Sequence, residues 1–206
     1  MTLLQRFAAL ALSVFLLPAC AGHYSGPVEV TRFVAENEAA LGQGQIAVTF
    51  AEDMSNLRAR DAFARAVGEQ LAMLGYEVVD ESGAATQVAL VRTSRDTIAT
   101  SRRARSPVSV GVGGSTGSYG SGVGVGLGIN LGGASRGPDV VSRLSVRISD
   151  NEGNSLWEGR AEHPVAFKSP DADIDASARI LASALFRDFP GGNGEVVTLS
   201  VDELSD

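Results

Sequence analysis

Residues 140–161, VVSRLSVRISDNEGNSLWEGRA, carry the pattern that decides the fold of this chain. From Val140 to Ser149, apolar side chains alternate with polar ones, which is the period of a strand with one buried face. The cluster Asp150–Gly153 is rich in turn-forming residues, and Ser155–Ala161 has the composition of a returning strand. The sequence therefore predicts an antiparallel hairpin, with Trp157 as a core residue between the sheet and a helix.

A helix is predicted directly after this hairpin. Ser169 is placed to cap its N-terminus, and Pro170 suits the first helical position. Two aspartates, Asp171 and Asp173, favour the positively polarised start of a helix. Apolar residues then repeat at intervals of four, three and four along one face, which comprises Ile174, Ala178, Leu181 and Leu185. The helix is expected to stop at residues 189–192.

A second helix is predicted earlier in the chain, from about Ser55 to Leu74. Ser55 or Asn56 can cap it, and Gly75 supplies the left-handed residue that commonly ends a helix. Its expected apolar face consists of Phe63, Val67, Leu71 and Leu74. The strand that follows at once indicates that this helix packs on the sheet.

Five further segments read as strands because they are rich in β-branched and aromatic residues. They are Val28–Phe33, Gln45–Phe50, Tyr76–Val79, Gln87–Thr93 (which could extend to Ile98) and Glu195–Val201. The predicted fold class is α+β: a mostly antiparallel sheet with two helices packed on one face, plus a Gly-rich hairpin or loop insertion.

The N-terminus has the three parts of a secretory signal. A weakly basic start with Arg6 precedes the apolar run Phe7–Leu17, which is too short to span a bilayer as a helix, and small residues follow. Its end, Leu17-Pro18-Ala19-Cys20, resembles the lipobox of bacterial lipoproteins. The resemblance implies diacylglycerol on the thiol of Cys20, cleavage before it and a further acyl chain on the new amine. The alternatives are an ordinary signal peptide cut nearby and an uncleaved anchor helix.

The predicted organisation of the chain follows from this start. Residues 1–19 are a lipoprotein signal peptide, 20–27 a lipid-anchored tether, 28–201 a single domain that contains a Gly-rich insertion at 106–137, and 202–206 an acidic tail. Two or more acyl chains hold a protein on a membrane persistently. Because Ala21, not an aspartate, follows the cysteine, the chain resembles lipoproteins sorted to the outer membrane. We expect it to face the periplasm, with the covalent lipid on Cys20 and no other cofactor.

The charge of the chain argues against one class of partner. The net charge is −7 over 206 residues, and removal of residues 1–19 takes away Arg6 and no acid, so the mature chain would carry −8. A general nucleic-acid binder needs a basic surface to displace counterions. We therefore expect no nucleic-acid partner. The single cysteine, Cys20, can form no internal disulfide.

Residues 106–133 alternate small aliphatic residues with glycine around a turn-rich centre. A strand pair with this period would place its aliphatic side chains on one face, among them Val123, Val125, Leu127 and Ile129. Glycine within a strand usually marks close approach of another backbone or a ligand. The segment could be a surface loop or partly ordered hairpin, a hairpin that packs against a partner or another copy, or a membrane-entering hairpin of an oligomeric barrel.

Three arginines, Arg102, Arg103 and Arg105, stand just before this segment and reverse the charge of an acidic chain locally. They could form an anion-facing patch for lipid phosphates or an acidic envelope polymer. The alternative is a solvated loop whose arginines pair with surplus carboxylates. Together with the aliphatic residues of the glycine-rich segment, they form the predicted interaction surface.

No pattern in the sequence predicts an enzyme, a metal site or a bound cofactor. Gly113–Gly117 matches G-x-S-x-G around Ser115, but glycine and valine follow where this motif requires a helix. Neither His23 nor His163 stands beside an obvious nucleophile in the sequence, and two separated histidines do not indicate zinc. The aspartates from Asp171 to Asp175 lack the glycine and glutamate of a calcium loop.

Five sequence blocks occur in an order that resembles a family of proteobacterial lipoproteins known only as a domain of unknown function. They are YSGPVEVTRF (24–33), AVGEQLAMLGYEVV (66–79), SPVSVGVGGSTGSYGSGVGVG (106–126), LWEGRAE (156–162) and ALFRDFPG (184–191). The resemblance implies an envelope location and transfers no catalytic or binding residue.

The sequence thus predicts a non-enzymatic envelope lipoprotein that binds another envelope component, associates with itself or scaffolds an assembly. The alternative is a subunit of an oligomeric outer-membrane pore or secretion assembly that uses the Gly-rich hairpin.

Overall fold

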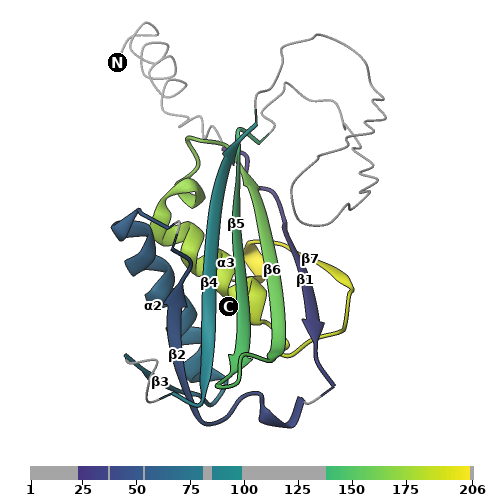
Figure 1. The fold of residues 1–206 in the computed structure, drawn as a ribbon. Helices are drawn as coiled ribbons and strands as arrows, with labels where there is room; N and C mark the ends of the chain where they lie inside the picture. The colour runs from purple at the N-terminus through teal and green to yellow at the C-terminus, as the bar shows by residue number, and fades with distance from the viewer. Residues whose placement is uncertain (1–22, 37, 53, 81–84, 99–137, 205–206) are drawn as a thin grey trace, which may run out of the picture.

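The computed structural model describes residues 23–36, 38–52, 54–80, 85–98 and 138–204 (Figure 1). They form seven strands, two α-helices and three short 3-10 turns. The strands are β1 (Val28–Val34), β2 (Gln45–Phe50), β3 (Glu77–Val79), β4 (Gln87–Thr97), β5 (Val140–Asp150), β6 (Ser155–Val165) and β7 (Val196–Leu199); the α-helices are α2 (Leu57–Met73) and α3 (Ile174–Phe186); and the 3-10 turns are η2 (Glu38–Ala40), η3 (Pro170–Ala172) and η4 (Asp202–Leu204).

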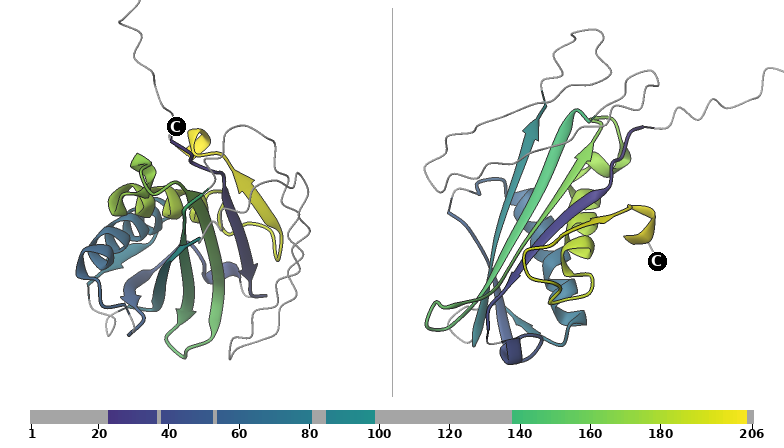
Figure 2. Two further views of the ribbon diagram at one scale, coloured as in Figure 1. Left: turned by 90° about the horizontal axis from the view of Figure 1, so that it is seen from above. Right: turned by 90° about the vertical axis from the view of Figure 1, so that its right-hand side faces the viewer.

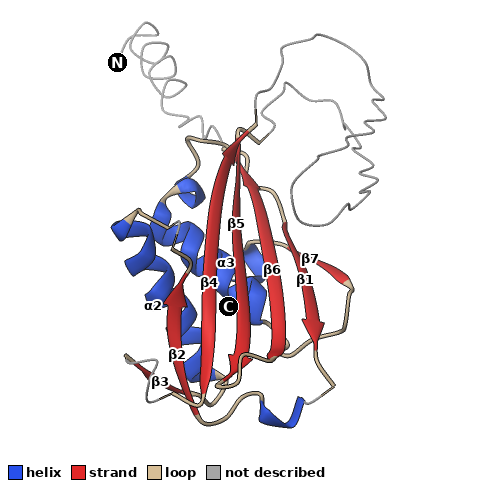
Figure 3. Ribbon diagram, viewed as in Figure 1, coloured by secondary structure: helices blue, strands red, loops and turns tan. Residues whose placement is uncertain are grey.

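All seven strands belong to one sheet in the order β3-β2-β4-β5-β6-β1-β7 (Figure 3). The pairs β2–β3 and β2–β4 are parallel, and the other four pairs are antiparallel. The three long central strands, β4, β5 and β6, pair along nearly their whole length. The structure therefore confirms an α+β fold with a mostly antiparallel sheet.

Both α-helices cover the same face of the sheet, as the view from above shows (Figure 2). The core lies between this helix layer and the sheet. Its largest fully buried apolar side chains come from both layers: Trp157, Ile46, Leu71, Leu144, Ile148, Leu181 and Leu185. The other face of the sheet carries polar side chains and cross-strand ion pairs, such as Arg147 with Glu158 at 3.2 Å. An antiparallel sheet can tolerate one solvated face, so a single helix layer suffices to make the core.

The β5–β6 hairpin is present as the alternation predicts. The carboxylate of Asp150 accepts hydrogen bonds from the backbone N–H groups of Glu152 and Asn154 in the turn, at 3.0 and 2.8 Å. Strand β6 runs on to Val165, beyond the predicted end at Ala161. Trp157 is 1% exposed and stacks on Phe186 of α3 with ring centroids 5.4 Å apart, which confirms it as a core residue.

Helix α2 agrees with its prediction. The side chain of Asn56 accepts a hydrogen bond from the backbone N–H of Ala59 at 3.1 Å, which identifies it as the N-cap. Gly75 follows the helix with a φ of +103°, a conformation that residues with a Cβ rarely adopt.

Helix α3 begins later than predicted. The predicted cap, Ser169, accepts a hydrogen bond from the backbone N–H of Asp171, but it caps only the 3-10 turn η3. The cap of α3 is Asp173, whose carboxylate accepts from the backbone N–H of Asp175 at 3.0 Å. This N–H bond is the main reason that the pKa of Asp173 lies below its usual value. The prediction was wrong because two capping residues follow one another, and only the second precedes a run of helical hydrogen bonds.

One arginine is enclosed where β1 meets the end of α3. Arg32 is 4% exposed, and its guanidinium donates to the carbonyl oxygens of Leu185 and Ala184 at 2.9 Å each and of Arg187 at 2.8 Å. These carbonyls belong to the last turn of a helix, where no intrahelical partner remains. Arg32 therefore acts as a side-chain cap for the C-terminus of α3.

The last residues fold back onto the helix layer. After β7, the turn η4 places Leu204 against the core. Arg187 donates a hydrogen bond to the carbonyl oxygen of Glu203, and the Glu203 carboxylate accepts from the backbone N–H of Ser200 at 2.8 Å. The described part of the predicted acidic tail is thus attached to the fold.

Candidate functional site

The described chain enters the fold at one end of the sheet. The residues before β1 lie along the end of β6: the N–H of Gly26 donates to Pro164 at 2.9 Å, and the N–H of Ala166 donates to Tyr24 at 2.8 Å. Between them, Ser25 forms an isolated bridge with Val165. The predicted tether is therefore bound to the sheet from Tyr24 onward.

Residues 99–137 are joined to the fold at this same end. Strand β4 ends at Thr97 opposite Val140, where β5 begins. The N–H of Ile98 donates to the carbonyl oxygen of Asp139 at 2.8 Å, and the N–H of Asp139 donates to Val165 at 3.1 Å. The two flanks of the insertion are thus hydrogen-bonded neighbours beside the entry of the chain, as Figure 1 shows at the upper end of β4, β5 and β6.

The predicted site residues lie outside the described part of the chain. They are Cys20, Arg102, Arg103, Arg105, Val123, Val125, Leu127 and Ile129, and the weak hydrolase candidate Ser115 lies outside it as well. Chain connectivity still limits some positions. Cys20 is four residues before Tyr24, and Arg102 is four residues after Ile98, so each Cα lies within about 14 Å of its described neighbour.

The end of the sheet where these segments meet, defined here by residues 24–27, 97–98, 138–140 and 164–169, is called the entry end. It exposes apolar side chains next to a cation: Phe167 is 70% exposed and Ile98 is 39% exposed, and Lys168 follows Phe167. The backbone N–H of Phe167 donates to the carboxylate of Asp139 at 3.2 Å, which fixes the loop after β6.

His163 lies beside a serine, a contact that the sequence did not reveal. Its Nε2 is 3.1 Å from the hydroxyl of Ser25, which is exposed, whereas His163 itself is fully buried. The sequence could not show this contact, because Ser25 and His163 are 138 residues apart and meet only where the residues before β1 lie along the end of β6. Within the described residues, Nδ1 of His163 has no hydrogen-bond partner, so the acid of a hydrolase triad is not supplied there.

Burial determines the protonation of this histidine. Removal from water lowers the pKa of His163, and the nearby carboxylate of Asp171 opposes the shift only partly. A neutral imidazole therefore joins the segment of Ser25 to the sheet.

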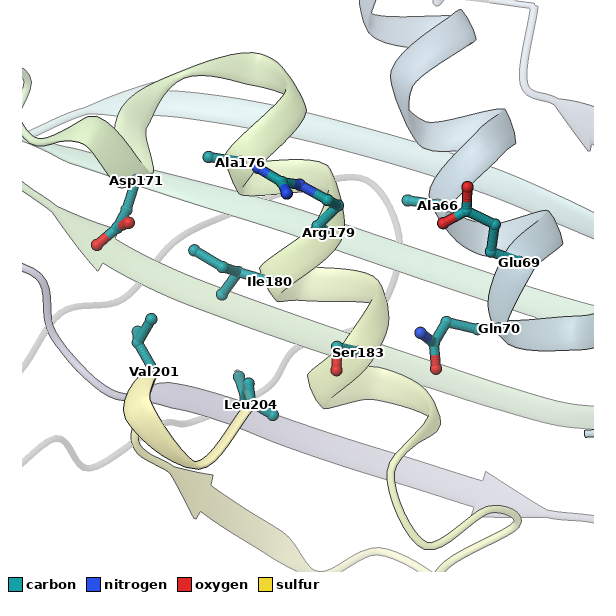
Figure 4. Close-up of a pocket in the computed structure, with 10 residues that line it drawn as sticks. All are labelled: Ala66, Glu69, Gln70, Asp171, Ala176, Arg179, Ile180, Ser183, Val201 and Leu204. Carbon is teal, nitrogen blue, oxygen red and sulfur yellow. The ribbon is translucent and has the colours of Figure 1, made fainter. Parts of the chain in front are cut away.

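The helix layer contains a hollow of about 450 Å³ (Figure 4). Glu69 and Gln70 reach it from α2, Arg179 and Ser183 reach it from α3, and Leu204 closes it from the C-terminal turn. The side chains carry charges of both signs. Within the described ranges, no group of three or more His, Cys, Asp or Glu side chains could hold a metal ion, and no helix is long and apolar enough to cross a membrane.

Comparison with known proteins gives a likeness of fold only. No family model matches the chain, and no curated protein matches it. The chain is similar to the crystal structure of a PDZ domain protein from Parabacteroides distasonis, with 14% identity and a TM-score of 0.52 over 94% of this chain. It spans only 41% of that protein's length.

Two structures of a PelC dodecamer from Paraburkholderia phytofirmans are also similar, at a lower level. A single-residue variant of PelC is 10% identical, and PelC in another crystal form is 12% identical. In each case the likeness covers 75% of this chain and 91% of the other, with a TM-score of 0.38.

Proposed function

We propose that this protein is a lipid-anchored cell-envelope protein, attached through Cys20 to the outer membrane and facing the periplasm. The observation that carries the proposal is the entry end. If Cys20 bears the lipid, the hydrogen bonds of residues 24–26 to the end of β6 keep the Cα of the lipidated residue within about 14 Å of this end of the sheet. The domain then has a defined membrane-proximal end, and the flanks of residues 99–137 leave from it.

The surface of the entry end suits this orientation. Phe167 is an exposed aromatic side chain beside Lys168. Such a pair suits the boundary between lipid tails and headgroups, where the ring can contact the tails and the ammonium the headgroups. The opposite end of the hairpin, at Asp150–Asn154, is polar and carries the carboxylates of Asp150 and Glu152. The strands between the two ends are 11 residues long, so the ends are roughly 35 Å apart.

The role that we propose is a non-enzymatic binding or scaffolding one. The arginines Arg102, Arg103 and Arg105 follow Ile98 by four, five and seven residues, so chain connectivity keeps the Cα of Arg102 within about 14 Å of Ile98. At this position they can meet lipid phosphates or an acidic envelope component, and the aliphatic residues Val123, Val125, Leu127 and Ile129 can meet another envelope protein or a second copy of the chain.

The anchor is tested with Cys20→Ser. We expect the wild-type protein to incorporate labelled palmitate and to sediment with outer membranes, and the variant to lose the label and remain an unprocessed precursor. Persistence of labelling and processing in the variant would overturn the proposal.

The orientation is tested separately, because lipidation occupies the only natural cysteine. A fluorophore is attached at Lys168→Cys, or at Asn151→Cys in the opposite turn as a matched control, in the lipidated protein in vesicles. Nitroxide-labelled headgroups should quench the probe at position 168 more strongly than the probe at 151. Equal quenching, or stronger quenching at position 151, would exclude the proposed membrane-proximal end.

A second candidate function is a subunit of an oligomeric outer-membrane pore or secretion assembly. It is favoured by the pairing of Ile98 with Asp139, because the insertion continues from two antiparallel strands that point to the proposed membrane. The test compares the native mass of the detergent-extracted protein with that of a variant lacking residues 106–137. A large ring that dissociates without these residues supports the assembly; a monomer in both cases contradicts it.

A further inference from the structure

A cleft of about 350 Å³ lies between the N-terminal ends of α2 and α3 and the helix-facing side of β4 and β5. This volume is at the lower end of the range of small-molecule sites in proteins. The cleft is separate from the hollow lined by Glu69 and Arg179, and the proposed anchor does not use it.

Two buried serines line this cleft. Ser142 of β5 is 4% exposed and Ser177 of α3 is 3% exposed. Ser142 occupies a register position that faces the helices, where its neighbours Val140 and Leu144 are apolar. Neither serine hydroxyl has a hydrogen bond to another residue that the structure describes. Because both serines line the cleft, their hydroxyl groups can donate to or accept from a molecule that enters it.

An arginine stands directly opposite one of these serines. Arg95 of β4 pairs in register with Ser142 of β5, and both line the cleft. The guanidinium is fixed by a 2.6 Å hydrogen bond from Nη2 to the carbonyl oxygen of Ala172. This is its only hydrogen bond within the described ranges, so its other N–H groups are available to a ligand.

The acidic groups near the cleft are held by other cations. Arg58 lies 3.8 Å from the carboxylate of Asp173 and 3.3 Å from that of Asp175, and Arg65 lies 3.7 Å from Asp175. These pairs partly neutralise the carboxylates at the start of α3. Arg95 therefore remains the cation that a ligand in the cleft would meet.

The remaining wall of the cleft is apolar. Phe63 is 6% exposed and Met54 is 9% exposed, and the half-buried Ile174 faces them from the first turn of α3. The cleft thus combines a cation and two hydroxyls with a hydrophobic surface, which is the arrangement of a site for an amphipathic molecule.

We propose that this cleft binds a small amphipathic anion. Its phosphate or carboxylate accepts hydrogen bonds from Arg95, Ser142 and Ser177. Its short alkyl chain packs against Met54, Phe63 and Ile174. The proposal does not depend on the lipid at Cys20.

The test is a calorimetric titration of the purified full chain with hexyl phosphate, in discs of zwitterionic lipid, or in plain buffer if the chain does not insert. We expect saturable binding, and affinities at least about tenfold weaker for inorganic phosphate and for hexanol. Absence of saturable binding would overturn the proposal. Binding of inorganic phosphate as tight as that of hexyl phosphate would show that the apolar wall is not used, and would also overturn it.

Variants locate the site. Arg95→Gln should weaken binding of hexyl phosphate at least about tenfold, and Ser177→Ala roughly threefold or more. Arg92→Gln, on the same strand but facing away from the helices, is the matched control and should change affinity by less than about twofold. Equal effects of Arg95→Gln and Arg92→Gln would overturn the proposal. Thermal unfolding of each variant verifies its fold, and Ser177→Ala keeps the test decisive if Arg95→Gln does not fold.

The titration also distinguishes two sources of the anion. It is repeated in discs that contain an anionic phospholipid. Competition by this lipid would identify a membrane headgroup as the source, whereas unchanged affinity for hexyl phosphate would identify a free amphiphile in solution. Either result is consistent with the proposed site.

Discussion

The Nε of Arg32 donates a 2.9 Å hydrogen bond to the carbonyl oxygen of Leu185, which joins strand β1 to the last turn of α3 across 153 residues of sequence. Burial lowers the pKa of Arg32 relative to its ordinary value, and the nearby Asp188 carboxylate opposes this shift. Gly191 packs against the same side chain, because a Cβ at that position would lie 2.7 Å from Arg32 Cδ. A charged group thus serves as an internal cap that other residues enclose.

We predict that Arg32→Met destabilises the protein by about 3–5 kcal/mol, because three carbonyl oxygens at the end of α3 lose their donor. Chemical denaturation followed by circular dichroism measures this change. Arg92→Met is the matched control, since Arg92 is exposed on β4, and it should cost less than about 0.5 kcal/mol. Equal effects of the two substitutions would show that Arg32 does not cap the helix.

His163 predicts a dependence of stability on pH. Its pKa is lowered in the folded protein by burial, whereas the unfolded chain takes up a proton at about pH 6.5. The unfolded state therefore binds more protons below that pH, and the free energy of unfolding falls as the pH decreases, by up to about 1.4 kcal/mol per pH unit. His163→Gln should remove this dependence between about pH 6.5 and pH 5.

The measurement is the free energy of unfolding of both proteins across that range. Asp150, Asp173 and Glu203 have pKa values below their ordinary ones, so their contribution is lost only at lower pH, near the pKa of an unfolded carboxyl group, and does not interfere. The same pH dependence in wild type and His163→Gln would contradict the assignment to His163.

We predict that substitution by alanine changes the stability of the protein in opposite directions at two glycines. In β6, a Cβ at Gly159 would lie 2.3 Å from Trp157 Cη2 and 2.7 Å from Leu185 Cδ1, so Gly159→Ala should destabilise the protein by about 1–3 kcal/mol. In α2, a Cβ at Gly68 meets only Val78 Cγ1 at 3.8 Å, so Gly68→Ala should stabilise it by about 0.5–1 kcal/mol. Thermal unfolding measures whether each substitution lowers or raises the stability of the protein, and Trp157 fluorescence reports a change in the surroundings of the indole. A neutral Gly159→Ala would mean that the indole can move aside.

Leu181 tests the predicted face of α3. It is fully buried, so Leu181→Ala should cost about 2–5 kcal/mol. Leu57→Ala is the same substitution at a side chain that is 71% exposed, and it should cost less than about 0.5 kcal/mol. Urea denaturation distinguishes the two, and a small effect at Leu181 would assign a different face of α3 to the core.

Local patterns predicted the strands and helices because the rules that govern them act over a few residues. The hairpin of β5 and β6 follows from the alternation of apolar and polar residues, and the sequence limits the cap of α2 to Ser55 or Asn56, of which the structure uses Asn56. The order of strands did not follow, because β1 pairs with β6 and β7 through contacts between distant segments. Strand β6 continues beyond the predicted end at Ala161 and through Pro164, whose carbonyl oxygen accepts a hydrogen bond from the N–H of Gly26.

The site residues were harder to predict, although one signal was present. Arg32 shares its face of β1 with Val28 and Val30, and Ser142 shares its face of β5 with Leu144, so polar residues at inward positions of strands marked both places. Their partners in α3 could not be inferred, because the way a helix packs on a sheet depends on both elements together and cannot be read from the sequence of either one. The contact of Ser25 with His163 depends on pairing across 138 residues in the same way.

The hydrogen bond from the N–H of Ile98 to the carbonyl oxygen of Asp139 joins the two flanks of the insertion just beyond the last pair of β4 and β5. The conformational entropy of a closed loop changes only with the logarithm of its length, so each doubling costs about 0.6 kcal/mol. Segments of different length and composition can thus be inserted between residues 98 and 139 without changing the core of the domain. For engineers, residues 98 and 139 are the graft points at which a foreign epitope or reporter could replace the native insertion.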